Sequence, residues 1–283
     1  MLFPERFKIQ LFFFSIALTL IGSSSAKNVP GTGTVNTSAQ DKSNQTPSSI
    51  IDAITRNNFN LARLCYGKNI QANIIMNSLA ICDRGKGKTP SACAAQAALR
   101  GRKLDSYNKA LDGAGCSKDP DISWSNLART TDRASLRGNT DAQMCYVAGY
   151  VKVNTPIALA TYKQRAVSYA NAALQRGDWR IVELFSTPQR VIASGGAGAF
   201  ANFKGAGNPL TVYSANQLLM LGAKGTYHEY VTSRSDDAAR FLTPEQQKQG
   251  KSWAQKEFDA QFYKSPPLGA RVTPCVDTDP ADQ

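Results

Sequence analysis

Six cysteines are the residues of this 283-residue chain most able to do covalent chemistry. An even number of thiols suits up to three disulfides, and six cysteines allow 15 pairings, among which the sequence does not choose. A zinc site needs closely spaced ligand pairs such as C-x-x-C, and the chain contains none. The spacing therefore predicts structural disulfides, with the pairing open. The candidates are Cys65, Cys82, Cys93, Cys116, Cys145 and Cys275.

Groups suited to acid–base or nucleophilic catalysis are sparse. His228 is the only histidine, so a triad, a Cys-His pair or a histidine metal site would have to be built around it. We interpret it as a partly packed residue on a helix surface. The four glutamates after residue 26 form no recognisable pair of the kind that glycoside hydrolases use. A protein without catalysis is therefore predicted, and the alternative is a cell-wall hydrolase or similar enzyme acting through a carboxylate such as Glu183.

Two glycine-rich stretches could be taken for phosphate cradles. Residues 194–209, SGGAGAFANFKGAGNP, lack the preceding strand and the immediately following helix start that such a cradle needs. The second stretch is DRGKGKTP, residues 83–90. Cys82, directly before it, stands where the first glycine of a nucleotide-binding loop belongs. Both stretches are interpreted as connections between helices. The sequence predicts no cofactor and no bound metal.

The elements that carry these residues begin after an export signal. Arg6 and Lys8 precede a short apolar run, and Ser24 and Ala26 are the small residues that signal peptidases recognise. We expect residues 1–26 to be a removed signal peptide and residues 27–49, rich in Thr, Ser, Asn and Gly, to be a disordered linker. After removal of the signal no stable membrane span is expected, and the protein is predicted to be periplasmic or secreted.

From residue 50 to residue 265 the apolar spacing is helical. Asn57-Asn58 is expected to break the first helix. Thr155-Pro156 and Thr243-Pro244 are typical helix starts, the second with Gln246 placed for a capping box. No alternating apolar run or hairpin turn indicates strands. The sequence therefore predicts an all-α protein, with a Pro-rich, acidic tail over residues 266–283 that Cys275 would attach to the helices.

Four glycines are expected to mark joints between helices. Each follows an Ala/Leu helix end and a basic residue, and the glycines are 37, 39 and 48 residues apart. They are Gly101, Gly138, Gly177 and Gly225. A glycine can close a helix in the left-handed conformation, and Asn139 or Asp178 can then cap the next helix. The Arg-Gly-Asp tripeptide at residues 176–178 is therefore interpreted as a stop-and-start signal instead of an adhesion motif.

Residues 125–205 resemble a degenerate member of the Sel1-like and tetratricopeptide-like repeat family. The resemblance rests on RASLRGNTDAQMCYVAGY and YKQRAVSYANAALQRGDW, in which a glycine turn precedes a helix beginning Asp-Ala-Gln and a second helix ends in Ala-Ala-x-x-x-Gly-Asp. It implies antiparallel helix pairs stacked as a short α/α superhelix, which the disulfides would stabilise. It also implies a protein that binds other proteins or envelope polymers and is not itself catalytic.

The charge of the chain favours acidic partners. The formal net charge is +12, and residues 1–26 carry +1 of it through Glu5, Arg6 and Lys8, which leaves +11. No aromatic-interleaved basic strand or recognition-helix pattern indicates nucleic-acid binding. The sequence thus predicts an exported binding or scaffolding module of a bacterial envelope whose partner is a protein or an acidic polymer. A secreted effector is a further alternative, and the oligomeric state is left open.

Overall fold

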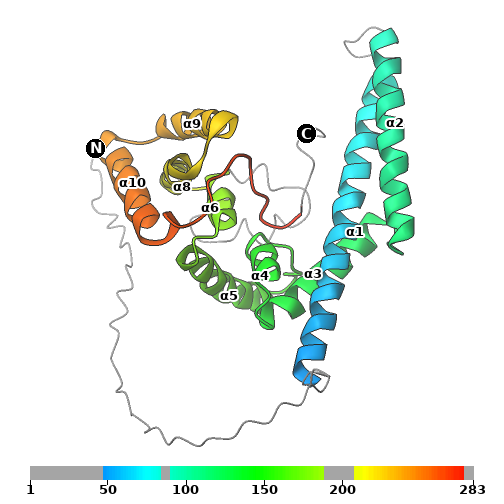
Figure 1. Ribbon diagram of the computed structural model, residues 1–283, viewed down its shortest axis with the longest axis horizontal. Helices are drawn as coiled ribbons and strands as arrows, with labels where there is room; N and C mark the ends of the chain where they lie inside the picture. The colour runs from blue at the N-terminus through cyan, green and yellow to red at the C-terminus, as the bar shows by residue number, and fades with distance from the viewer. Residues whose placement is uncertain (1–46, 84–89, 188–206, 277–283) are drawn as a thin grey trace, which may run out of the picture. The chain divides into compact units, whose positions relative to one another are not determined.

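The computed structural model describes residues 47–83, 90–187 and 207–276, and throughout these ranges the protein is built of helices (Figure 1). The expected all-α fold is confirmed: the described residues contain no strand, and one isolated bridge joins Ala223 to Leu268. The helices are α1 (Pro47–Asp83), α2 (Pro90–Gly113), α3 (Pro120–Leu136), α4 (Thr140–Val147), α5 (Pro156–Gln175), α6 (Trp179–Ser186), α8 (Pro209–Gly222), α9 (Gly225–Ala239) and α10 (Pro244–Glu257), followed by a π-helical turn (Phe258–Phe262).

Local sequence signals start several of these helices. Proline occupies the first turn of α3, α5, α8 and α10, where no backbone N–H is required for the helix ladder. The residue before each proline accepts a backbone N–H with its side chain, and these caps are Asp119, Thr155, Asn208 and Thr243. The capping box of Thr243 and Gln246 is present in both directions. The two helix starts expected from the sequence are therefore confirmed.

Helix α1 is longer than the sequence indicated. It begins at Pro47, inside the stretch expected to be linker, and runs unbroken for 37 residues. The expected break at Asn57-Asn58 is wrong, because Phe59, Ala62 and Tyr66 are buried on one face of this helix. That burial outweighs the modest helix propensity of two exposed asparagines.

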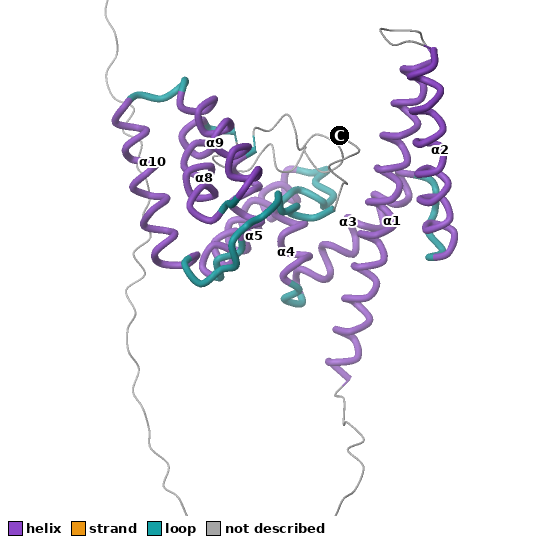
Figure 2. The backbone as a smooth tube through the Cα atoms, turned by 45° about the horizontal axis from the view of Figure 1, so that its top comes forward, coloured by secondary structure: helices purple, strands orange, loops and turns teal. Residues whose placement is uncertain are grey.

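Two helices pack against different halves of α1 (Figure 2). Helix α2 lies beside the C-terminal half of α1, and the disulfide Cys65–Cys116 fixes the end of this pairing. Helix α3 runs antiparallel to the N-terminal half: Asn69 donates to Ser123 at the start of α3, and Arg137, just after α3, pairs with Asp52. These links set the register of α3 on α1.

The apolar interior is divided between two main clusters. The larger joins α4, α5, α6, α8, α9 and α10 around fully buried side chains such as Tyr162, Ile181, Leu218 and Phe262. The smaller joins α1, α3 and α4 to the end of the chain and includes Phe59. Contacts run between helices that follow each other, such as α3 with α4, α4 with α5 and α6 with α8, and also between alternate ones, namely α1 with α3 and α8 with α10.

Two of the predicted glycine joints have the expected geometry. Gly138 and Gly177 have φ of 78° and 66°, in the left-handed region that favours glycine. At each joint the next residue donates its N–H to a carbonyl five residues back, and that residue's side chain caps the following helix. Arg-Gly-Asp at residues 176–178 is therefore a helix stop and start, as the sequence predicted.

The other two glycines differ from expectation. The joint predicted at Gly101 is wrong, because α2 runs through this residue without interruption while packing along α1. Gly225 does lie between two helices, but it is the first residue of α9 and does not close α8.

The segment 266–276 packs on the helices. Trp179 Nε1 donates to Pro266 O at 3.0 Å, and Leu268 exchanges backbone hydrogen bonds with Gly222 and Lys224. Cys275 is bonded to Cys145, so the expected attachment of the tail is confirmed. The predicted signal peptide, residues 27–46 of the predicted linker, residues 277–283 and most of the glycine-rich stretch lie outside the described residues. Within the described helices, none has both the length and the apolar character needed to cross a membrane.

Candidate functional site: the groove between α1 and α3

Four of the six candidate cysteines form disulfides. Cys65–Cys116 joins residues 51 apart in sequence and Cys145–Cys275 joins residues 130 apart. Cys82 and Cys93 lie in α1 and α2, and their side chains are outside the described part of the chain. Two disulfides are thus confirmed and the third stays a prediction. The four bonded sulfurs offer no thiolate nucleophile while the disulfides are intact.

Glu183, the carboxylate considered for an enzyme, is a structural clamp. It is 1% exposed, and its Oε1 accepts from Arg234 Nη1 at 3.0 Å and from Arg271 Nε at 2.8 Å. Tyr227 Oη donates to Oε2 at 2.6 Å. Burial, together with the adjacent carboxylate, raises the pKa of Tyr227, so this hydroxyl remains protonated as a donor. The cluster joins α6, α9 and the segment after Ser265.

The remaining catalytic and metal candidates lie apart. His228 is partly buried on α9, as the sequence predicted. In the described residues, no group of three histidine, cysteine or acidic side chains could hold a metal ion. What the structure does bring together is a surface that sequence reasoning missed.

That surface is the groove between α1 and α3, which we call the α1–α3 groove. It has a volume of about 410 Å³. The disulfide Cys65–Cys116 closes one end, and α1 contributes Leu61 and Ala62 to the lining. A second hollow, of about 530 Å³, lies further along the same two helices and includes Thr55 and Leu136. Together the two hollows follow α3, whose 17 residues span roughly 25 Å.

Three arginines line the α3 side of the two hollows: Arg129 and Arg133 line the α1–α3 groove, and Arg133 and Arg137 line the second hollow. Arg129, Arg133 and Arg137 are spaced four residues apart, so they stand one above another on a single face. Arg137 is paired with Asp52 at 2.8 Å, and Arg129 donates to Asn126 at 2.9 Å. Arg133 is exposed and has no acidic partner among the described residues. We call these three residues the α3 arginine ridge.

Two leucines beside the α3 arginine ridge, one on each helix, are open to solvent. Leu61 on α1 is 44% exposed and Leu136 at the end of α3 is 60% exposed. Large apolar side chains beside fixed positive charge are typical of surfaces that bind a protein segment with both apolar and acidic residues. The four-residue spacing in RTTDRASLR could have shown the α3 arginine ridge from the sequence. The spacing could not show that Leu61 and Leu136 lie near the ridge, because that depends on how α1 and α3 pack against each other.

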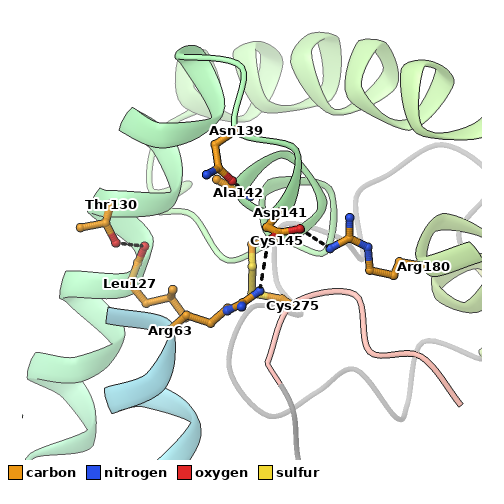
Figure 3. Close-up of a disulfide and its surroundings, with 9 residues drawn as sticks. All are labelled: Arg63, Leu127, Thr130, Asn139, Asp141, Ala142, Cys145, Arg180 and Cys275. Atoms are coloured by element: carbon orange, nitrogen blue, oxygen red, sulfur yellow. Dashed lines mark hydrogen bonds and ion pairs between the residues drawn. A yellow bond between two sulfur atoms is a disulfide. The ribbon is translucent and has the colours of Figure 1, made fainter. Parts of the chain in front are cut away.

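A partly exposed ionic junction links α4 to α1 and α6 (Figure 3). Asp141 on α4 contacts Arg180 Nη1 at 2.6 Å and Arg63 Nη1 at 3.9 Å. Arg180 is held further by Asp178 at 2.8 Å. The disulfide Cys145–Cys275 lies beside this junction. Through Arg63, these contacts link α1 to α4 and α6.

No protein-family model matches this chain, and neither a curated protein nor a solved structure was found to match it.

Proposed function

We propose that this protein is an exported binding module that holds an acidic, partly apolar segment of another protein in the α1–α3 groove. The observation that carries the proposal is the α3 arginine ridge, of which Arg133 is without an acidic partner in the described chain, beside the exposed Leu61 and Leu136. An acidic side chain of the partner would neutralise the ridge, and its apolar side chains would cover the two leucines.

Export accords with the disulfides, which persist in oxidising compartments outside the cytoplasm. We infer a periplasmic or secreted protein that is cleaved after Ala26. The experiment is N-terminal sequencing of the protein recovered from cell fractions. A mature protein that begins at Lys27 supports the inference, and an uncleaved cytoplasmic protein contradicts it.

The repeat architecture is part of the same proposal. Contacts between alternate helices and the two matching joints at Gly138 and Gly177 support a short stack of helix pairs like that of Sel1-like and tetratricopeptide-like proteins. Proteins of this kind bind partners on the surface that the stacked helices form.

Binding is tested with synthetic peptides and matched protein variants. The probe is an amphipathic helical peptide with leucines on one face and flanking glutamates, compared with the same peptide carrying glutamine in place of glutamate. Arg129→Glu with Arg133→Glu should weaken binding of the acidic peptide by about tenfold or more, because attraction becomes repulsion. Lys248→Glu with Lys251→Glu, on exposed positions of α10, changes the net charge equally and should leave the affinity unchanged.

Two results would contradict the proposed partner. Equal binding of the acidic and the glutamine peptide would show that the ridge is not used. Tighter binding of an acidic polysaccharide or of poly-glutamate, which offer no apolar face, would favour an envelope polymer over a protein.

A further inference from the structure

A regular series of residues runs along α1 on the side opposite Phe59 and Tyr66. The residues recur at alternating spacings of four and three, the heptad pattern of paired helices. In order they are Ile50, Ile54, Asn57, Leu61, Leu64, Lys68, Gln71 and Ile75. We call residues 50–64 of this series the α1 stripe. Its members point away from Phe59 and Tyr66, which are buried.

Only the C-terminal part of the heptad series has a partner. Ile75 is 3% exposed and Gln71 is 5% exposed, and Lys68 Nζ lies 4.7 Å from the ring centre of Tyr107 on α2. Helix α2 thus covers this part of the series. Figure 2 shows that α2 accompanies only one half of α1.

The N-terminal part of the series is uncovered among the described residues. Ile50, Ile54, Leu61 and Leu64 are 45%, 54%, 44% and 46% exposed. Helix α2 cannot reach them, because it ends at Gly113 and the chain is then fixed to Cys65 through Cys116. The α1 stripe is therefore the direct continuation of an existing helix–helix interface, and a helix is the shape that fits it.

The arrangement of the α1 stripe is nearly symmetric about Asn57. Ile50 and Leu64 are each seven residues from it, and Ile54 and Leu61 are three and four residues from it. When two such helices lie antiparallel with Asn57 at the twofold axis, the isoleucines of one copy face the leucines of the other. Asn57 then meets Asn57, where the two amides can donate to and accept from each other. A single polar residue in an apolar seam fixes the register of the pair.

We propose that the α1 stripe binds the same stripe of a second copy of this chain, as an antiparallel helix pair. The proposal rests on observations other than those of the proposed function, but the two surfaces share Leu61, so pairing would cover one apolar residue of the groove. Ile50, Ile54, Asn57 and Leu64 do not line the α1–α3 groove. The α3 arginine ridge lies outside the pair.

The test is sedimentation equilibrium of the mature protein over a range of concentrations. The expected result is a monomer–dimer equilibrium, which Ile54→Glu with Leu64→Glu converts to monomer at every concentration. Ile157→Glu is the matched control, because Ile157 is 81% exposed on α5 and lies outside the stripe. Circular dichroism of each variant should match the native protein, since the changed side chains lie at the surface.

Salt distinguishes this association from the binding proposed for the groove. Two copies that each carry a net positive charge repel each other, so added salt should strengthen the dimer. The same salt should weaken binding of an acidic peptide in the α1–α3 groove. The salt dependence of association therefore shows which of the two proposals has failed.

The orientation is tested by mixing Ile50→Cys and Leu64→Cys variants under mild oxidation. The antiparallel pair predicts a crosslink between the two variants and little crosslinking of either variant with itself. A protein that stays monomeric at all concentrations overturns the proposal. So does a dimer that survives Ile54→Glu with Leu64→Glu, or a pair in which Ile50→Cys crosslinks to itself.

Discussion

The region of α1 and α3 and the region of α6 to α10 use the same kinds of residue in different ways. In the second region even a carboxylate, Glu183, is buried and has two arginine partners. In the first region Arg133 has no acidic partner among the described residues, and leucines such as Leu61 and Leu136 stand open to solvent. The matched charges around Glu183 act as a scaffold, whereas an arginine without an acidic partner and exposed leucines that lie along one groove are suited to binding.

The largest effect on stability is expected at the clamp of the scaffold region. Glu183→Gln leaves Arg234 and Arg271 without their counter-charge in a largely buried site, so the free energy of unfolding should fall by about 3 kcal/mol. Glu229→Gln, an exposed position on α9, should change it by less than about 0.5 kcal/mol. Urea unfolding measures both. Equal effects of the two substitutions would mean that Glu183 is not a clamp.

The two disulfides should separate an effect on stability from an effect on binding. Cys145→Ala with Cys275→Ala removes a crosslink between residues 130 apart and should lower the free energy of unfolding by about 2 to 4 kcal/mol. Cys65→Ala with Cys116→Ala should also destabilise the protein, because it removes a second crosslink. Only this second pair closes the α1–α3 groove, so only its removal should weaken binding of the acidic peptide directly. Thermal unfolding and peptide titration of both variants make the comparison.

The glycine joints give smaller effects of opposite sign. A Cβ at Gly177 would lie 2.5 Å from Gln261 O at positive φ, whereas Gly138 has positive φ and open space. Gly177→Ala should therefore cost about 2 kcal/mol or more and Gly138→Ala about 1 kcal/mol. Gly101→Ala, inside α2 with nothing within 4 Å, should stabilise the protein by about 0.5 to 1 kcal/mol. Destabilisation at Gly101 would contradict the continuous helix.

The smallest effect concerns alkaline pH. Burial raises the pKa of Tyr150 to about 12, above its ordinary value near 10. The unfolded chain loses this proton first, so the stability that Tyr150 contributes is complete below about pH 10 and is lost as pH rises toward 12. Tyr150→Phe should reduce this loss by up to about 1 kcal/mol per pH unit. Unfolding at pH 9 and pH 11 measures it, and an unchanged slope in the variant would contradict the assignment.

The sequence predicted those features that local residues determine. The caps at Thr155 and Thr243 and the joints at Gly138 and Gly177 depend on neighbours within a few residues, and all four are confirmed. The helix break predicted at Asn57-Asn58 and the joint predicted at Gly101 were wrong, because packing along α1 overrides local helix propensity. The α1–α3 groove could not be predicted from the sequence, since it depends on residues far apart in the chain, such as Asp52 and Arg137, which are 85 residues apart.

Hydrogen exchange of the mature protein with and without the acidic amphipathic peptide tests the central claim most directly. Binding in the α1–α3 groove predicts added protection over residues 55–65 and 126–137, and none over residues 209–257. Protection confined to residues 209–257, or spread evenly over all helices, would contradict the assignment of α1 and α3 as the binding region.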